Sequence, residues 1–208
     1  MVMNIYWIGG SPCSGKSSIA DLLAKQYGWQ VYHCDEAFDR HVQRADAVRH
    51  PWLSKVPHIV WDAFWMRPLE VQLRNVIEAY AEEFSMILDD LRALPADRPI
   101  LVEGTALLPE LLADIGVDGR RAFWLIPAPE FQRVQYPRRG AWVQAILEQC
   151  SQPQQALTNW MDRDIETGRH IQREAEARGL KVLTVDGVHS IEENTQMVMK
   201  YFLGGIDK

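Results

Sequence analysis

The sequence has few of the residues that mark several protein classes. It has three cysteines, Cys13, Cys34 and Cys150, and no two of them form a CxxC pair. A disulfide framework and a zinc ribbon are therefore not expected, and a reduced, cytoplasmic compartment fits this usage best. No apolar run reaches the roughly 18 residues that a membrane helix needs. Residues 1–8 have neither a basic start nor a signal-peptide cleavage site. We expect a protein that is neither exported nor bound to a membrane.

Basic residues are in the minority. The 208-residue chain has 22 Lys and Arg against 28 Asp and Glu, which gives a formal net charge of -6. This balance disfavours a protein that coats nucleic acid, so any anionic ligand must be bound by a local group of residues. Hydrophobic residues make up 47% and charged residues 24% of the chain, which disfavours disorder. The length predicts a single domain over residues 1–208.

Short apolar segments predict the strands of a parallel sheet. There are five of them, at residues 5–8, 30–34, 100–102, 122–126 and 181–185. Apolar residues at helical spacing separate them, at residues 17–27 and 68–94, in a short helix from Pro129, and in a long helix from Pro153 to about Gly179. This alternation predicts an α/β fold with helices packed on a five-stranded parallel sheet.

The connections between the predicted strands are unequal in length. Residues 36–96 and 131–178 are each longer than the single helix that joins two parallel strands. We expect residues 36–96 to form a helical insertion and residues 131–178 to include a lid. The core would then comprise residues 1–35, 97–130 and 179–208.

One motif points to specific chemistry. Residues 10–17 match the pattern GxxxxGK[ST] between a predicted strand and a predicted helix. In this motif the glycines let successive backbone N–H groups point at phosphate oxygens, the lysine supplies a mobile positive charge, and the final hydroxyl ligates Mg²⁺. The sequence therefore predicts a site for the polyphosphate of a nucleotide with Mg²⁺, and Ser17 as a metal ligand. The predicted nucleotide-binding residues are Gly10, Ser11, Pro12, Cys13, Ser14, Gly15, Lys16, Ser17 and Ser18.

With this loop, the chain resembles the P-loop small-molecule kinases, the group that contains nucleoside monophosphate, shikimate and gluconate kinases. The resemblance also rests on His33-Cys34-Asp35-Glu36 after the second strand, on Val102-Glu103-Gly104-Thr105 after the third, and on an arginine-bearing lid. It implies a three-layer fold with the sheet in adenylate-kinase-like order, ATP with Mg²⁺, and an acceptor bound under the helical insertion. It also implies that Asp186 and Gly187 belong to the loop that contacts adenine.

Two departures from these kinases concern the acceptor. Shikimate kinases usually have a DxD sequence after the second strand, whereas this chain has Asp35-Glu36-Ala37. Adenylate kinases have a DGFPR-like turn after the third strand, whereas this chain has Glu103-Gly104-Thr105-Ala106. The sequence therefore predicts neither shikimate nor a nucleoside monophosphate as the acceptor, and its identity stays open.

Carboxylates at strand ends are candidates for proton transfer and metal binding, because ligands of open α/β sheets bind there. Asp35 is predicted to accept the proton of an acceptor hydroxyl or to organise Mg²⁺; the alternative is a helix N-cap. Glu103 is predicted to organise Mg²⁺, with a salt bridge as its alternative. Gly104 and Thr105 are expected to shape the acceptor pocket.

Arginines are concentrated in the predicted lid. Arg133, Arg138 and Arg139 lie in a segment without acidic residues and are predicted to close over the transferred phosphoryl group. Arg163 and Arg169, in the long helix that follows, are further candidates. For each arginine the alternative is a solvated surface position.

The insertion contributes a second basic group. Arg40, His41 and Arg44 are spaced to lie on one helical face, which suits a phosphate or carboxylate of the acceptor. A solvated basic helix is the alternative. Trp52, Trp61 and Trp65 are expected to pack the insertion against itself, with stacking on a ligand as the alternative.

These features predict an ATP-dependent phosphotransferase that moves the γ-phosphoryl group to a small-molecule acceptor, most simply a hydroxyl. Two alternatives remain: a nucleotide-switched binding or ATPase module, and a kinase of polynucleotide 5′-hydroxyls. The negative net charge disfavours the second of these. Translational-type GTPases are not expected, because neither NKxD nor DxxG occurs in the sequence.

Overall fold

Five parallel strands form one sheet in the order β2-β3-β1-β4-β5 in the computed structural model, which describes residues 4–204. The strands are β1 (Ile5–Gly10), β2 (Gln30–His33), β3 (Ile100–Glu103), β4 (Ala122–Pro127) and β5 (Lys181–Val185). All five predicted strands and their parallel direction are confirmed. The ends of the predicted core, residues 1–3 and 205–208, lie outside the described residues.

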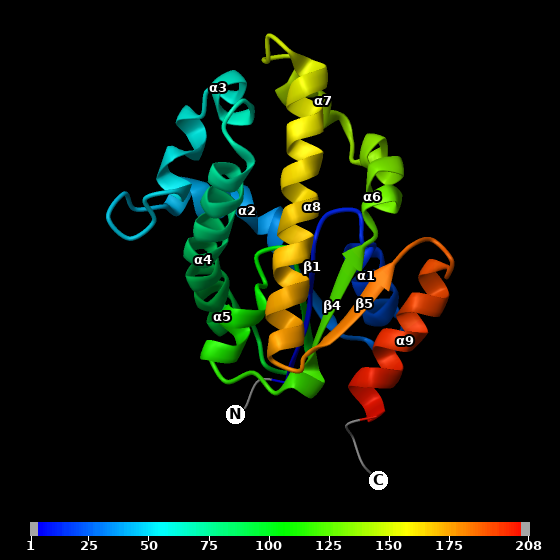
Figure 1. The fold of residues 1–208 in the computed structure, drawn as a ribbon. Helices are drawn as coiled ribbons and strands as arrows, with labels where there is room; N and C mark the ends of the chain where they lie inside the picture. Colours follow the sequence, from blue (N-terminus) through cyan, green and yellow to red (C-terminus); the bar gives the residue numbers. More distant parts are fainter. Residues whose placement is uncertain (1–3, 205–208) are drawn as a thin grey trace.

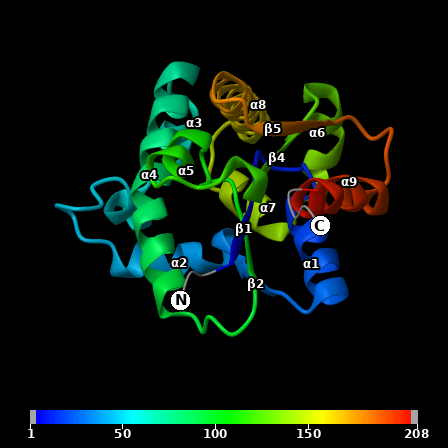
Figure 2. The ribbon, with the colours of Figure 1, turned by 90° about the horizontal axis from the view of Figure 1, so that it is seen from below.

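Helices cover both faces of this sheet, which gives the predicted three layers (Figures 1 and 2). On one face α1 (Lys16–Tyr27) and α9 (Ile191–Gly204) pack against apolar side chains of the strands. On the other face α4 (Leu69–Ala93), α5 (Pro109–Asp114) and α8 (Pro153–Ala177) enclose a second apolar cluster. No helix of residues 4–204 is long and apolar enough to cross a membrane.

Short helices complete the predicted insertion and lid. The insertion contains α2 (Cys34–Arg44), the 3-10 helix η1 (Leu53–His58) and α3 (Trp61–Trp65) before α4. The lid region contains α6 (Pro129–Gln135), η3 (Tyr136–Arg138) and α7 (Ala141–Leu147) before α8, and η2 (Gly119–Arg121) precedes β4. The helices predicted at residues 17–27, 68–94, from Pro129 and from Pro153 are all present within a few residues of those bounds.

The insertion packs against the lid rather than only against itself. Trp65 of α3 stacks on Trp160 of α8, with ring centroids 4.3 Å apart, as well as on Trp61. The backbone N–H and the hydroxyl of Ser151 donate to the carboxylate of Asp62 at 2.9 to 3.0 Å. These contacts join α3 to the turn between α7 and α8, at the upper end of the molecule in Figure 1.

Helix α8 extends from this lid contact to the sheet. Trp160, near its start, belongs to the apolar cluster with α3 and α7. Ile171 and Ala175, near its end, belong to the cluster on the sheet. The predicted lid region, residues 131–178, therefore includes a long helix whose second half is part of the core.

We expect two glycine substitutions to separate crowding from backbone strain. Gly10 has a φ of 136°, and a Cβ there would lie 2.0 Å from the backbone oxygen of Leu125 on β4. Gly28, the C-cap of α1, has a φ of 68° and nothing within 4 Å of its added Cβ. Gly28→Ala should cost about 1 to 2 kcal/mol of unfolding free energy, the penalty of the left-handed conformation. Gly10→Ala should cost about 3 kcal/mol or more, because the strand backbone cannot withdraw from the added methyl group.

Urea denaturation followed by circular dichroism measures both losses. Equal losses for the two variants would contradict the close approach of β1 and β4 at Gly10.

Candidate functional site

The loop between β1 and α1 has the backbone conformation of a phosphate cradle. Cys13, with a φ of 68°, is the one non-glycine residue with positive φ among residues 4–204, and Gly15 has a φ of 81°. Left-handed residues of this kind turn neighbouring backbone N–H groups toward a common point, which binds anions. The start of α1 at Lys16 adds the positive end of a helix dipole.

A buried positive charge and a buried negative charge lie beside this loop. Lys16 is 5% exposed, and Glu103, the last residue of β3, is 1% exposed. Burial alone raises the pKa of the Glu103 carboxyl, but the hydrogen bond from His33 and the charge of Lys16 hold it below its ordinary value. Glu103 is therefore an ionised carboxylate at the carboxyl end of the sheet.

His33 orients this carboxylate. Nδ1 of His33, the last residue of β2, lies 2.8 Å from Oε1 of Glu103, and Nε2 lies 3.3 Å from Asp21 on α1. The hydrogen bond to Glu103 raises the pKa of His33, although burial opposes this. Glu103 thus forms the ion pair that was the alternative to metal binding, and its partner is His33. The sequence analysis did not identify His33, although its place at a strand end was the available signal.

The second oxygen of Glu103 fits a cation. Oε2 is buried and has no hydrogen-bond partner of normal geometry among the described residues. The Ser17 hydroxyl is nevertheless close enough to help lower the pKa of this carboxyl. An ionised oxygen in this position is costly unless a positive charge compensates it. Ser17, exposed on the first turn of α1, adds the oxygen that the motif uses for Mg²⁺. No group of three His, Cys, Asp or Glu in residues 4–204 could hold a metal without further ligands.

Asp35 lies inside a helix rather than at its N-cap. The chain passes from β2 directly into α2, so His33 is the N-cap and Asp35 is in the first turn. The N-cap alternative is therefore wrong. The physical reason is that α2 begins at Cys34, directly after β2, so Asp35 already has helical backbone and adds a negative charge to the first turn. Asp35 is exposed and makes no hydrogen bond to another described residue. Thr105, in the turn after β3, is buried.

The structure separates the lid arginines. Arg139 lies 3.2 Å from the carboxylate of Asp164, and Arg163 lies 2.6 Å from the same carboxylate. Arg133 is exposed and pairs with Asp162. The third predicted lid residue, Arg138, donates to a glutamine one turn before it in the chain. Arg139 and Arg163 thus lie together on one carboxylate. The adjacent Arg163 and Asp164 in the long predicted helix were the sequence signal for this ion pair.

A cavity of about 420 Å³ adjoins the phosphate loop. Its walls come from residues 13–15, from the lid through Arg138 and Arg139, and from the β5–α9 connection through Gly187 and Ile191. Asp186 holds that connection in a turn by accepting a hydrogen bond from the N–H of Val188 at 3.0 Å. Gly187 thus lines the cavity beside the loop, and Asp186 shapes the turn that contains it.

The prediction that His41 lies with Arg40 and Arg44 on a basic face that binds the acceptor is wrong. This side chain is fully buried between Glu83, 3.2 Å from Nδ1, and Asp90, 3.1 Å from Nε2. It points inward because α2 packs on α4, where two carboxylates stabilise a buried imidazole. Arg40 and Arg44 are exposed, and Arg44 pairs with Asp90 at 2.7 Å.

Comparison with known proteins identifies the fold. No protein-family model and no curated protein matches this chain significantly. Its structure is similar to that of TT1252 from Thermus thermophilus, with 18% sequence identity, a TM-score of 0.51 and coverage of 98% of each chain. It is also similar to shikimate kinase from Acinetobacter baumannii in complex with shikimate, with 17% identity and a TM-score of 0.51 over 100% of this chain and 97% of that chain. Together with the sheet order and the phosphate loop, these similarities establish that the chain has a P-loop kinase fold.

Proposed function

We propose that this protein transfers the γ-phosphoryl group of ATP to a hydroxyl group of a small-molecule acceptor. The observation that carries the proposal is the ionised, buried Glu103, with one unpartnered oxygen, beside Lys16 of the phosphate loop. Glu110 on α5 also has a buried oxygen without a hydrogen-bond partner, so the free oxygen of Glu103 points to a cation only together with the neighbouring Lys16 and Ser17. A cation that accompanies polyphosphate satisfies it.

The phosphate loop and Lys16 bind the β- and γ-phosphates, and Arg139 neutralises charge on the moving phosphoryl group. The acceptor oxygen attacks the γ-phosphorus while the bond from that phosphorus to the β–γ bridging oxygen breaks. Asp35 accepts the proton of the acceptor hydroxyl, and ADP leaves with the bridging oxygen. When bound, Mg²⁺ supplies charge neutralisation at the phosphates, and Ser17 and Glu103 are the residues that hold it, directly or through water.

The nucleoside of ATP occupies the cavity of about 420 Å³ beside the loop. Phe131, Val185 and Ile191 give this cavity apolar walls, which suit the faces of a purine base. Gly187 lets the β5–α9 connection approach closely, since a Cβ there would lie 2.8 Å from the Phe131 ring.

The acceptor binds on the opposite side of the phosphate loop, between the insertion and α8. Asp35 on α2 and Arg163 on α8 both act on the Tyr80 hydroxyl of α4, whose pKa is raised, mainly by burial. In this proposal Gly104, which approaches Cys34 at the start of α2, and the buried Thr105 line this region. Arg44 contributes little to an anionic acceptor while it pairs with Asp90.

A screen for ADP release tests this proposal. Small hydroxyl and phosphate compounds are added singly to the protein with ATP and Mg²⁺, beside a reaction without acceptor. ADP release that depends on one compound, with that compound recovered as its phosphate ester, supports the proposal. Slow hydrolysis that no compound stimulates contradicts it and favours a nucleotide-switched module.

The two lid arginines that differ most in burial should differ in their effect on turnover. Arg139 is largely buried at the loop, whereas Arg133 is exposed. We expect Arg139→Ala to lower kcat by about a hundredfold with a smaller change in KM for ATP, because its contact strengthens in the transition state. Arg133→Ala should change kcat by less than about threefold, the effect of removing an exposed ion pair.

Steady-state kinetics at saturating acceptor measures both values. The reverse order of effects would contradict the role given to Arg139.

A further inference from the structure

A buried carboxylate on α8 joins two arginines and a tyrosine. Asp164 is 2% exposed, and its Oδ1 accepts hydrogen bonds from Nε and Nη2 of Arg163 at 3.0 and 2.6 Å. Its Oδ2 accepts from Nη1 of Arg139 at 3.2 Å and from the Tyr136 hydroxyl at 2.7 Å. Both oxygens are therefore satisfied, by groups from α8 and from the lid segment at η3.

This cluster lies against the phosphate loop. Gly168 is one helical turn beyond Asp164 on the same face of α8, and a Cβ there would lie 2.9 Å from the hydroxyl oxygen of Ser11. The thiol of Cys13 gives a second indication. Burial raises its pKa, and the charges of Arg139 and Asp164 both act on it. Two residues of the loop, Ser11 and Cys13, are thus next to the cluster.

Aromatic rings fix the planes of the two guanidinium groups. The guanidinium carbon of Arg163 lies 4.8 Å from the centre of the Trp65 ring. That of Arg139 lies 4.9 Å from the Trp142 ring. Arg139 also lies 5.0 Å from the centre of the Tyr136 ring. Each group is therefore held by one oxygen of Asp164 and by at least one aromatic face, which restricts both its position and its orientation.

We propose that Asp164 is a positioning residue that holds Arg139 and Arg163 in the orientation needed to contact the transferred phosphoryl group. This inference rests on the proposed phosphotransferase function. Two positive charges and one negative charge leave the cluster with an excess of one positive charge for a phosphate. Among the described residues, no acceptor engages Nη2 of Arg139 or Nη1 of Arg163, so these N–H groups face no competing partner.

Charge and position make opposite predictions for Asp164→Asn. The change removes a negative charge beside the phosphates, so simple electrostatic attraction predicts tighter ATP binding and no loss of rate. The positioning role predicts that the arginines lose their fixed orientation. We expect the dissociation constant for ATP with Mg²⁺ to stay the same or fall. We expect kcat to fall about a hundredfold, the cost of misplacing a catalytic group by about 1 Å.

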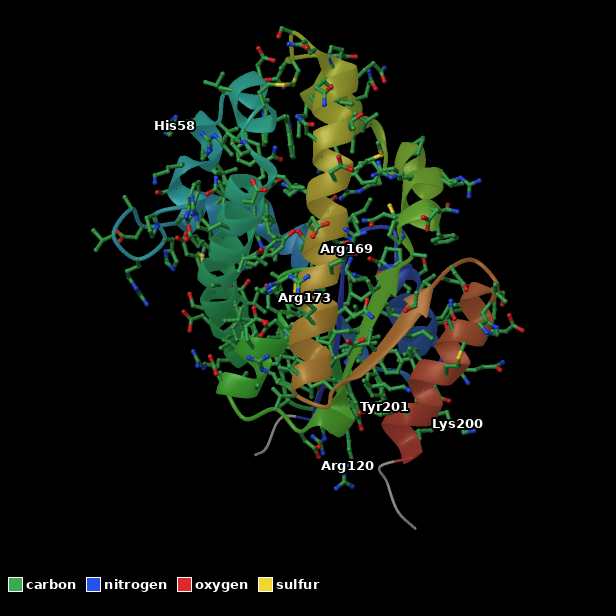
Figure 3. All side chains as sticks on the ribbon, in the orientation of Figure 1. His58, Arg120, Arg169, Arg173, Lys200 and Tyr201 are labelled. Atoms are coloured by element: carbon green, nitrogen blue, oxygen red, sulfur yellow. The ribbon has the colours of Figure 1, made fainter. Side chains whose placement is uncertain are left out.

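Glu166→Gln is the matched control. It makes the same change of charge two residues further along α8, where Glu166 pairs with the exposed Arg169, which extends from the helix surface in Figure 3. Its kcat should stay within about twofold of the wild type, as for an exposed ion pair. Tyr136→Phe keeps every charge but removes the hydrogen bond to Asp164 and the one that the Tyr136 hydroxyl accepts from Nη1 of Arg139 at 2.9 Å. Its kcat should fall about three- to tenfold.

Besides kcat, the experiment measures four quantities for each protein. They are the affinities for ATP and for ADP alone by calorimetry, the melting temperature by circular dichroism, and the affinity for ADP with aluminium fluoride, which mimics the phosphoryl group in transfer. We expect Asp164→Asn to bind ADP normally and to lose at least about tenfold in affinity for the mimic, because the cluster acts on the transition state. This measurement needs no acceptor.

The outcomes separate the inference from the proposed function. A wild type that binds no ATP contradicts the proposed function, and the inference falls with it. A wild type that binds ATP and the mimic, with Asp164→Asn binding both equally well, overturns only the inference. Parallel losses of ATP affinity, mimic affinity and melting temperature would show a structural role and also overturn it. If Asp164→Asn does not fold, an unchanged rate and mimic affinity in Tyr136→Phe overturns it.

Discussion

Lys16→Ala should bind ATP at least about tenfold more weakly and turn it over about 10² to 10³ times more slowly than the wild type. The side chain is almost completely buried at the loop, so its charge acts on the phosphates with little screening by water. Alanine is a good helix former at the start of α1. The melting temperature should nevertheless fall somewhat, because the buried Glu103 carboxylate loses the compensating charge of Lys16.

Lys25→Ala is the control for this prediction. Lys25 lies in the last turn of the same helix and is exposed, so the change removes an equal charge far along α1 from the loop. Calorimetry with ATP and Mg²⁺ distinguishes the two variants. If Lys16→Ala bound ATP as tightly as Lys25→Ala, residues 10–17 would not be the phosphate cradle.

The sheet could be predicted closely because its three central strands are buried on both faces. Such strands are continuous apolar runs, and β1, β3 and β4 are each read directly from four to six neighbouring residues. Gly28 also marked the end of α1 correctly, since the left-handed C-cap there favours glycine. These are local signals, and no knowledge of the tertiary structure was needed to interpret them.

Contacts between distant elements could not be predicted in the same way. The sequence gives His41 helical spacing with Arg40, but not the fact that Glu83 and Asp90 of α4 face it across 42 and 49 residues of chain. The cluster around Asp164 is similar, since Tyr136 and Arg139 approach it from 25 to 28 residues away. A buried polar side chain is explained by its partners, and here those partners come from other helices.

The residues of the candidate site also fall into those predicted from local sequence and those that depend on distant contacts. The phosphate loop is a contiguous motif, so its residues were identified together. Glu103 was identified from its strand end, but His33, which orients it, was not, because a histidine has many uses and its partner is 70 residues away. The tertiary fold decides which arginines lie near the phosphate loop. The positions of the arginines in the sequence therefore could not show that Arg163 lies beside Arg139.

The surroundings of Asp35 suit its proposed role as a base. Asp35 is exposed in the first turn of α2 and has no hydrogen-bond partner among the described residues. Glu103, by contrast, is ionised, buried and held by His33, which suits a fixed metal ligand better than a group that must gain and lose a proton. The two carboxylates therefore have environments that suit different tasks.

Asp35→Asn should lower the rate of transfer to the acceptor by about 10² to 10⁴, the range that general-base catalysis supplies. ATP should still bind, because the change leaves the phosphate loop intact. The melting temperature should fall only slightly, since a carboxylate in a first helical turn stabilises the helix by about 0.3 to 1 kcal/mol. Single-turnover measurements with the acceptor from the screen isolate the chemical step from product release.

Asp39→Asn is the matched control for that change. Asp39 is exposed on α2, one turn after Asp35, so the substitution removes the same charge from the same helix. A role in catalysis predicts a large loss of rate for Asp35→Asn and almost none for Asp39→Asn. A role limited to the helix predicts small losses of stability in both and an unchanged rate. An Asp35→Asn protein that transfers phosphate at the wild-type rate would exclude Asp35 as the base, and Glu36, its exposed neighbour, would be the next carboxylate to test.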